Sequence, residues 1–225
     1  MQGLSIRLFK GAWESALMTF LFWCLIYMSK LPLYLAHGAG AGHQSSDFLR
    51  AFADTLTQQH ARPVVPVTFD YMKEQERTGK RRPPSKFVSL VPEFAAQIDT
   101  EKALIVAGKS MGGRVATQLS EQENVKAIVC LGFPFHPPGK PEKHRLAFLD
   151  AVSVPCLIIQ GTRDPFGKPE WVNEQTLNEK VEVQWFEGAD HDFKTLKKQK
   201  LSTDEVINNI SASIEAWLAR HGLDY

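Results

Sequence analysis

Residues 103–113 read ALIVAGKSMGG, and this stretch decides the expected fold. Its first five residues are all apolar, as is typical of a central parallel strand covered on both faces. After the glycines, residues 114–119 place apolar side chains at a helical spacing. The stretch therefore predicts a buried strand, a sharp turn that carries Ser110, and a helix.

The turn has the form Gly-x-Ser-x-Gly, from Gly108 to Gly112. A serine held between a strand and a helix has a strained backbone, so the residues two before and two after it must lack a side chain. Gly108 and Gly112 meet this need, and Gly113 gives the turn extra freedom. The pattern is that of a nucleophile elbow, which presents a reactive serine at the end of a strand.

The same letters allow a second interpretation, because Gly-Lys-Ser also ends the phosphate-binding loop of nucleotide-binding proteins. Such a loop needs another glycine five residues before the Gly-Lys pair, with flexible chain between them. This chain has Ala103 at that position, and the interval is the apolar strand itself. We therefore set nucleotide binding aside. A structural turn with an inert serine stays open as the plainer alternative.

The composition of the chain limits other classes of function. Its 225 residues are 44% hydrophobic, enough for one substantial core, and a net charge of +1 gives no reason to expect a nucleic-acid partner. Of the three cysteines, Cys130 and Cys156 lie in apolar runs, which favours buried thiols over disulfides. No cysteine has a second ligand at the spacing of a zinc site. We expect neither a metal nor a cofactor.

Residues 1–30 form an apolar N-terminal segment of uncertain role ahead of the predicted domain, 31–225. Arg7, Lys10 and the apolar run 16–28 imitate a signal peptide. No small-residue cleavage site follows, however, and the run is shorter than the roughly 20 residues that span a bilayer. A packed or docking segment, a signal or membrane anchor, and an aberrant start all stay open. We favour the first, hence a cytoplasmic protein over a membrane-associated or exported one.

From residue 31 onward, strand-like and helical segments alternate, the pattern of a mostly parallel sheet with helices on both faces. We expect strands at 33–36, 64–69, 103–107, 127–131, 156–160 and 181–186. We expect helices at about 46–60, 86–98, 111–121, 169–178 and 203–221. The interval 132–155 is too short for a large lid. Because ligands bind beyond the carboxyl ends of strands in such sheets, the residues after each strand are the candidate site.

Polar residues follow the last two predicted strands on the edge that carries Ser110. Asp164 comes after the fifth strand and His191 after the sixth. A serine hydroxyl is a poor nucleophile until an imidazole takes its proton, and the imidazole needs a carboxylate that fixes its tautomer. The set predicts Ser110 as nucleophile, His191 as base and Asp164 as acid. Asp190 and Asp192 are rivals for the acid, but they are awkwardly placed beside His191 in sequence.

With these motifs the chain resembles the α/β-hydrolase superfamily over nearly everything after residue 30. The order Ser, Asp, His is that of this fold. The segments that look most like one small lidless branch are HGAGAG at 37–42, GKSMGGR at 108–114, GFPFHPPGKPE at 132–142 and GADHDF at 188–193. That branch contains bacterial hydrolase-like proteins related to dienelactone hydrolases, and a subunit of an animal chromatin-modifying complex.

The resemblance implies a serine hydrolase that cleaves an ester, thioester or related acyl bond. It also implies an oxyanion hole from the backbone N–H groups of Met111 and Ala39. Dienelactone hydrolases carry cysteine where this chain has Ser110, so their substrate is not implied. The usual leading strands of the fold are not recognisable in residues 1–30. The chromatin-complex relative keeps a second interpretation open, a hydrolase-fold protein used for binding.

The pocket beside the serine is expected to be open and partly apolar. Gly38 and Gly40 let backbone N–H groups turn inward, and Phe133 and Phe135 offer apolar walls. The alternative for the two aromatics is a place in the core. The basic residues of 71–85 are expected to lie in a long loop that rims the same edge. We expect a small-molecule acyl substrate here.

Overall fold

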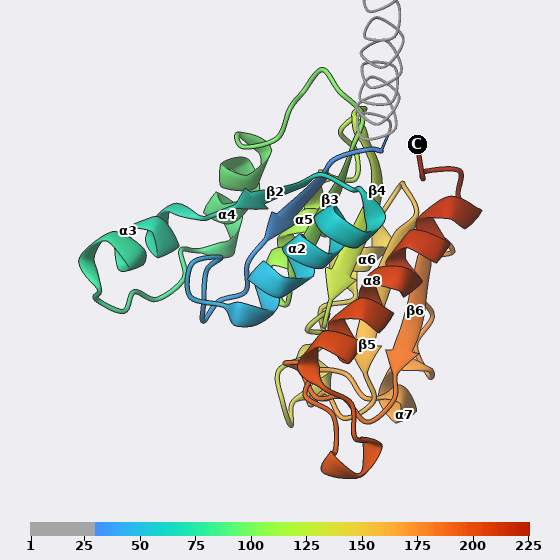
Figure 1. Cartoon of the computed structure of the whole chain (residues 1–225). Coiled ribbons are helices and arrows are strands. Elements are labelled where there is room, and N and C mark those ends of the chain that lie inside the picture. Colours follow the sequence, from blue (N-terminus) through green and yellow to red (C-terminus); the bar gives the residue numbers. More distant parts are fainter. Residues whose placement is uncertain (1–29) are drawn as a thin grey trace, which may run out of the picture.

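The computed structural model describes residues 30–225, and the predictions for residues 1–29 lie outside the described residues. Six parallel strands form one sheet in the order β2-β1-β3-β4-β5-β6, with helices on both faces (Figure 1). The first described strand, β1, lies inside the sheet, and the chain then steps to the edge at β2 and crosses back to β3. This arrangement confirms the predicted fold class.

The helices and strands follow the predicted order. The strands are β1 Leu33–Ala36, β2 Val64–Val67, β3 Leu104–Lys109, β4 Val125–Leu131, β5 Cys156–Gly161 and β6 Val181–Phe186. The helices are α2 Asp47–His60, α3 Asp70–Thr78, α4 Phe87–Ala95, α5 Met111–Ala116, α6 Ala147–Asp150, α7 Pro169–Val172 and α8 Thr203–Arg220. Short 3₁₀ turns lie at η1 Thr117–Leu119, η2 Pro141–Lys143 and η3 Lys197–Gln199. All six predicted strands are present.

Helix α3 lies where the sequence indicated a basic loop. Only Tyr71 and Met72 of this helix are buried, so its apolar pattern is too short to be recognised. Its charged residues pair one turn apart, as Arg77 does with Glu74 at 2.9 Å. Gly79 ends the helix in the left-handed region at a φ of 68°. Local ion pairs and a glycine cap, and not an apolar face, define this element.

Three helices are shorter than predicted, and the change is smallest in α4, which ends at Ala95 and not at residue 98. The segment 169–178 contains only the single turn α7, and the segment 111–121 divides into α5 and the 3₁₀ turn η1. Beyond α7, the side chain of Asn178 donates to the backbone carbonyls of Asp150 and Val152, at 2.9 and 3.1 Å. These bonds tie the chain to the end of α6.

Side chains of the strands alternate between two cores, one on each face of the sheet. Leu33 and Leu35 pack with helices α2 and α8, whereas Tyr34 and Ala36 pack with α3, α4 and α5. Figure 1 shows α2 and α8 side by side along one face. Since both faces are covered, the apolar residues of β3 have 0% exposure. This burial explains why the central strands are apolar at every position.

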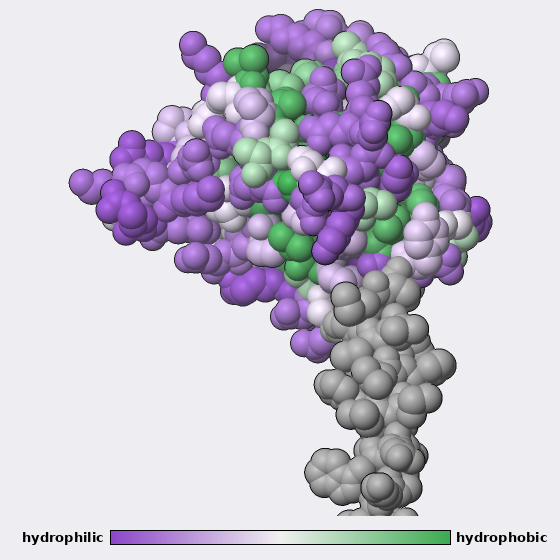
Figure 2. All heavy atoms as spheres, turned by 90° about the horizontal axis from the view of Figure 1, so that it is seen from above, coloured by the Kyte–Doolittle hydropathy of each residue, from purple (hydrophilic) through white to green (hydrophobic). Residues whose placement is uncertain are grey.

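The described part of the chain has no large lid. Residues 132–155, between β4 and β5, contain only the turn η2 and the four-residue helix α6. Among the described helices, none combines the length and the hydropathy needed to cross a bilayer. The face shown in Figure 2 is largely hydrophilic, with apolar residues in small groups between polar ones.

Candidate active site

Ser110 lies on the turn between β3 and α5, as the Gly-x-Ser-x-Gly pattern predicts. Its backbone has φ 52° and ψ −112°, a conformation that side-chain-bearing residues rarely adopt. The N–H of Ser110 donates to the carbonyl of Leu131 at 2.9 Å, which ties the turn to the end of β4. The surrounding sheet therefore holds the serine in this strained conformation.

The glycines of the turn are required by close backbone contacts. A Cβ on Gly108 would lie 2.2 Å from the carbonyl carbon of Gly112, and one on Gly112 would lie 2.6 Å from the carbonyl oxygen of His37. A Cβ on Gly113 would lie 2.8 Å from the carbonyl oxygen of Gly108. The prediction for the first two holds. Gly113 differs from expectation, because a side chain there would also clash with the backbone, so this glycine does not simply give the turn extra freedom.

The structure brings Ser110, Asp164 and His191 together. Nε2 of His191 lies 2.9 Å from Oγ of Ser110, and Nδ1 lies 2.7 Å from Oδ2 of Asp164. Ser110 follows β3, Asp164 follows β5, and the histidine follows β6. The carboxyl ends of these parallel strands meet at one edge of the sheet, which explains why residues 81 and 27 positions apart in sequence are neighbours.

Asp164 is fully buried, and its carboxylate accepts hydrogen bonds from other residues in addition to His191. Its Oδ1 accepts the N–H of Phe166 at 2.8 Å, and its Oδ2 also accepts the side-chain amide of Gln160 at 2.9 Å. Gly132, with φ 68°, lies so near that a Cβ there would be 3.3 Å from Nδ1 of His191. Sequence reasoning missed Gln160 and Gly132. A polar residue at the end of an apolar strand was the available signal for Gln160.

The two rival carboxylates have other partners. Oδ1 of Asp190 accepts the N–H groups of Asp192 and Lys194, at 2.9 and 3.0 Å, so this residue shapes the loop as expected. Asp192 forms an ion pair with Lys109 at 3.1 Å. Burial alone would raise the pKa of the Asp192 carboxyl, but the nearby cations, Lys109 first, outweigh burial and lower it.

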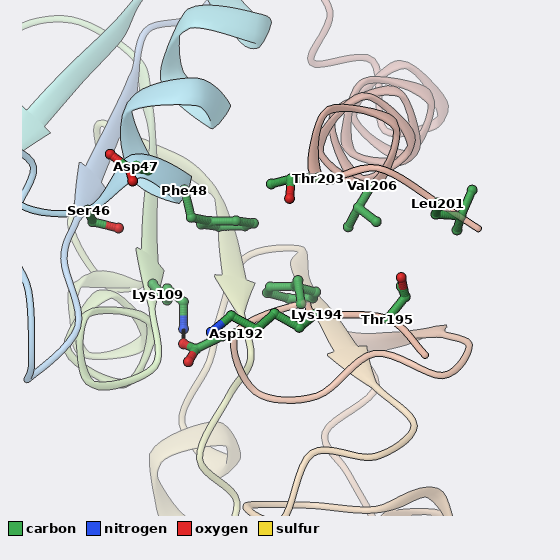
Figure 3. A pocket seen from close by; sticks show the side chains of 11 residues that line it. Ser46, Asp47, Phe48, Lys109, Asp192, Lys194, Thr195, Leu201, Thr203 and Val206 are labelled. Atoms are coloured by element: carbon green, nitrogen blue, oxygen red, sulfur yellow. Dashed lines mark hydrogen bonds and ion pairs between the residues drawn. The ribbon is translucent and has the colours of Figure 1, made fainter. Parts of the chain in front are cut away.

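Lys109, which sequence reasoning did not single out, holds the loop of His191. Its ammonium donates to the backbone carbonyl of His191 at 3.0 Å as well as to Asp192 (Figure 3). The side chain is nearly buried, and the residue directly precedes Ser110 at the end of β3. The lysine therefore links the strand that carries the serine to the loop that carries the histidine.

The loop after β1 lies against the serine, and buried hydrogen bonds fix its shape. Nε2 of the fully buried His37 accepts the N–H of Phe69 at 3.1 Å, so Nδ1 carries the proton and donates to the carbonyl of Gly38 at 2.7 Å. Burial lowers the pKa of His37 to about 4, which keeps the ring neutral. The hydroxyl of Tyr71 donates to the same carbonyl at 3.2 Å and to that of Ala39 at 3.3 Å.

Two backbone N–H donors lie near Ser110. The N–H groups of Ala39 and Met111 have no hydrogen-bond acceptor among residues 30–225. A Cβ on Gly38 would lie 3.7 Å from Cβ of Ser110, which shows how closely the loop approaches the turn. Both donors thus border the serine from neighbouring segments.

Ser110 opens into a cavity of about 290 Å³. The other residues that line it are Ala39, Pro84, Ser85, Phe87, Leu90, Met111, Arg114, Pro134, Arg145 and Phe166. Gly40, predicted to line this pocket, borders instead a shallow hollow beside α3 together with Gln75 and Glu76. The cavity is open, since no lid covers it in the described chain.

Phe133 and Phe135 lie in the core, and not on the wall of this cavity as predicted. Both have 0% exposure, and their rings pack edge to face at 5.0 Å. Gly167 packs so closely on Phe135 that a Cβ there would lie 2.5 Å from the ring. Pro134, between the two aromatics, faces the cavity instead. The alternative that the sequence left open for these residues is the correct one.

A larger cavity, of about 480 Å³, lies on another side of the His191 loop (Figure 3). It lies between the N-terminal ends of α2 and α8, and its lining includes Phe48, Lys109 and Asp192. None of Ser110, Asp164 and His191 lines it, so its volume does not make it the reactive site. Within residues 30–225, no three His, Cys, Asp or Glu side chains gather as metal ligands would.

Comparisons with known proteins agree with this architecture. The chain is similar in structure to the esterase domain of a Rhodothermus marinus protein, at 16% identity and a TM-score of 0.56, over 85% of this chain and 89% of that one. A thermophilic esterase from Thermogutta terrifontis matches at 13% identity and a TM-score of 0.58, over 84% and 90%. A serine hydrolase without a lid from Xanthomonas campestris matches at 17% and 0.53, over 85% and 83%.

At these identities the solved structures support the fold alone. The sequence family described as "Alpha/beta hydrolase domain" matches residues 29–219, which is most of the chain. The matched residues include Ser110, Asp164 and His191. The chain therefore belongs to the alpha/beta hydrolase domain family.

Proposed function

We propose that this protein is a serine hydrolase that cleaves an ester, thioester or related acyl bond of a small molecule through an acyl-enzyme on Ser110. The observation that carries the proposal is the chain of two hydrogen bonds through one imidazole. His191 lies 2.9 Å from the serine oxygen on one side and 2.7 Å from the buried carboxylate of Asp164 on the other. This is the geometry that an activated serine needs.

In the proposed reaction, Nε2 of His191 takes the proton of Ser110 as the serine oxygen bonds to the acyl carbon. Asp164 keeps the proton of the ring on Nδ1 and stabilises the imidazolium that forms. The free N–H groups of Met111 and Ala39 would donate to the oxygen that becomes negative. The imidazolium then protonates the leaving group, and a water molecule, activated by the same ring, releases the acid.

The strained backbone of Ser110 supports catalysis over a purely structural turn. A non-glycine residue at φ 52° and ψ −112°, outside the left-handed helical region, costs of order 1–3 kcal/mol, and such strain is found at many reactive sites. The turn also brings the backbone so close to Gly108, Gly112 and Gly113 that none of them could carry a side chain without a clash.

A fluorophosphonate probe tests the proposal, because it reacts only with an activated serine. We expect labelling of the folded protein, and loss of labelling in Ser110→Ala. His191→Ala should lower kcat/KM for a p-nitrophenyl ester by about 10⁴-fold, since the serine loses its base. His221→Ala is the matched control, because that ring binds the carbonyl of Trp217 at the far end of α8. Folded protein that neither labels nor turns over esters contradicts the proposal.

A further inference from the structure

Two guanidinium groups line the cavity of Ser110. Arg114 lies on α5, one turn after the serine, and Arg145 lies just before α6. Nη1 of Arg145 donates to the carbonyl of Pro134 at 2.9 Å, whereas Nε of Arg114 is buried without a hydrogen-bond partner. Among the described residues that line the cavity, none is acidic.

The aromatic neighbours of Arg114 orient its guanidinium but do not satisfy it. The central carbon of the group lies 4.4 Å from the ring centre of Phe87 and 5.2 Å from that of Phe148. Rings contact the face of a guanidinium, and its N–H bonds point outward from the edge. The rings therefore hold the guanidinium in place. Its Nε is buried, but its two Nη groups have no hydrogen-bond acceptor among residues 30–225 and are the donors left for a ligand in the cavity that Arg114 lines.

Placing these two cations together is unfavourable without an anion. Burial, and then repulsion from Arg145, lower the pKa of Arg114 to about 10. Burial also lowers the pKa of Arg145. Guanidinium groups with open donors are the groups that bind carboxylates by paired, charge-assisted hydrogen bonds. A ligand carboxylate would supply both the missing charge and the missing acceptor.

We propose that Arg114 and Arg145 form an anion subsite, and that the preferred substrates are esters or thioesters whose short acyl chain ends in a carboxylate. The inference rests on the proposed function, because it assigns the substrate class of the same site. The cavity of about 290 Å³ accommodates a short chain between Ser110 and the two arginines. The apolar wall of Phe87, Leu90 and Pro134 suits the methylene groups of that chain.

The test compares two esters of equal chain length, mono-p-nitrophenyl adipate and p-nitrophenyl hexanoate. We expect kcat/KM to favour the adipate ester by about 10-fold or more, and the advantage to shrink at high salt. Arg114→Gln and Arg145→Gln should each lower the ratio of the two kcat/KM values by about 10-fold. Arg114→Lys, which retains the charge, should keep part of the preference.

The matched control is Arg77→Gln, which removes an exposed guanidinium on α3 that pairs with Glu74 outside the cavity. Its ratio should equal that of the unaltered protein. If both pocket variants leave the ratio unchanged, or lower the two activities equally, the arginines only support packing and the subsite proposal is wrong. Arg145→Gln keeps this readout even if loss of the Arg114 guanidinium from beside Phe87 and Phe148 prevents folding.

Binding separates failure of the subsite from failure of the hydrolase proposal. Two variants are titrated calorimetrically with mono-p-nitrophenyl adipate: Ser110→Ala, which lacks the nucleophile and should bind the ester without cleaving it, and the double variant Ser110→Ala, Arg114→Gln. Binding that depends on Arg114, in a protein that hydrolyses neither ester, keeps the subsite and removes the hydrolase. Rapid hydrolysis of the hexanoate ester with no adipate preference and no such binding keeps the hydrolase and removes the subsite.

Discussion

The two ends of the parallel sheet contain arginines in opposite circumstances, one fully buried and one half-buried. At the amino end, Arg62 is fully buried and bonds to Glu215 through two nitrogens and to the carbonyl of Leu31 at 2.8 Å. At the carboxyl end, Arg114 has a buried Nε without a partner and a second arginine as its neighbour. A buried cation whose donors are satisfied holds the chain together, whereas a half-buried one that lines a cavity, with no acceptor for its Nη groups among the described residues, is available to a ligand.

The amino end is closed by a cluster of contacts around Glu215. This carboxylate of α8 pairs with Arg62 and with Lys30, the latter at 2.7 Å. Burial by itself would raise the pKa of Glu215, but its bonds to the two cations outweigh burial and lower it. Arg62 also donates to the carbonyl of Leu223 at 3.3 Å, so the cluster joins the start of β1 to the end of the chain. The strained turn of Ser110 and the cavity that it opens into lie at the other end.

Breaking the amino-end cluster should have the largest effect on stability. Arg62→Met leaves Glu215 buried with only Lys30 as an ionic partner, and we expect the free energy of unfolding to fall by about 3 kcal/mol or more. Urea unfolding measures this loss. The double variant Arg62→Met, Glu215→Leu should recover much of the stability, because no charge is then left unpaired. A loss below about 1 kcal/mol in the single variant would contradict a structural role for the pair.

Acid should weaken the carboxyl end through His37. Its pKa is about 4 in the folded protein against an ordinary 6.5, so the unfolded chain binds the proton more readily. The contribution of His37 to stability is complete above about pH 6.5 and is lost as pH falls toward 4, to a total of about 3 kcal/mol.

Unfolding free energies from pH 7 down to pH 4 check this expectation against His37→Gln, which can still donate and accept but does not titrate. The variant should lose less stability over that range than the unaltered protein. Because burial also lowers the pKa of His43, some acid sensitivity should persist in both proteins. Parallel pH profiles for the two proteins would show that His37 is not the group responsible.

The contrast between the two ends also explains what could be predicted from sequence. The strands were recognisable because residues such as Leu33 and Tyr34 pack into different cores, so that both faces had to be apolar. The meeting of Ser110, Asp164 and His191 was predictable because the carboxyl ends of parallel strands share one edge. Apolar runs in the sequence, and the polar residues that follow them, were enough for both inferences.

Features set by the packing of loops were not predictable in this way. Whether Phe133 or Pro134 faces the cavity depends on the contact of Gly167 with Phe135, which no period in the sequence reveals. From the sequence, Arg114 looks like an ordinary polar residue of a short helix, but in the fold its guanidinium packs against the rings of Phe87 and Phe148. Side-chain direction in loops depends on residues distant in sequence, and a single sequence does not record such contacts.

Lys109 provides the finest test of the contrast, because it is a nearly buried cation with two hydrogen-bond partners, comparable to Arg62, but at the end of the sheet that carries Ser110. We expect Lys109→Met to lower kcat by about 10-fold, equal to about 1.4 kcal/mol, with little change in KM. The reason is that the carbonyl of His191 and the carboxylate of Asp192 lose the donor that holds their loop against β3.

Lys109→Arg should restore most of the rate, since its guanidinium can donate to the same two oxygens. Steady-state kinetics on p-nitrophenyl hexanoate, which carries no charge, separates positioning of the histidine from attraction of an anion. A rise in KM with kcat unchanged would mean that Lys109 contacts the substrate. A fall in kcat alone would mean that Lys109 positions the loop of His191 and does not contact the substrate. Lys109 would then resemble Arg62, a cation held by partners within the chain, and not Arg114.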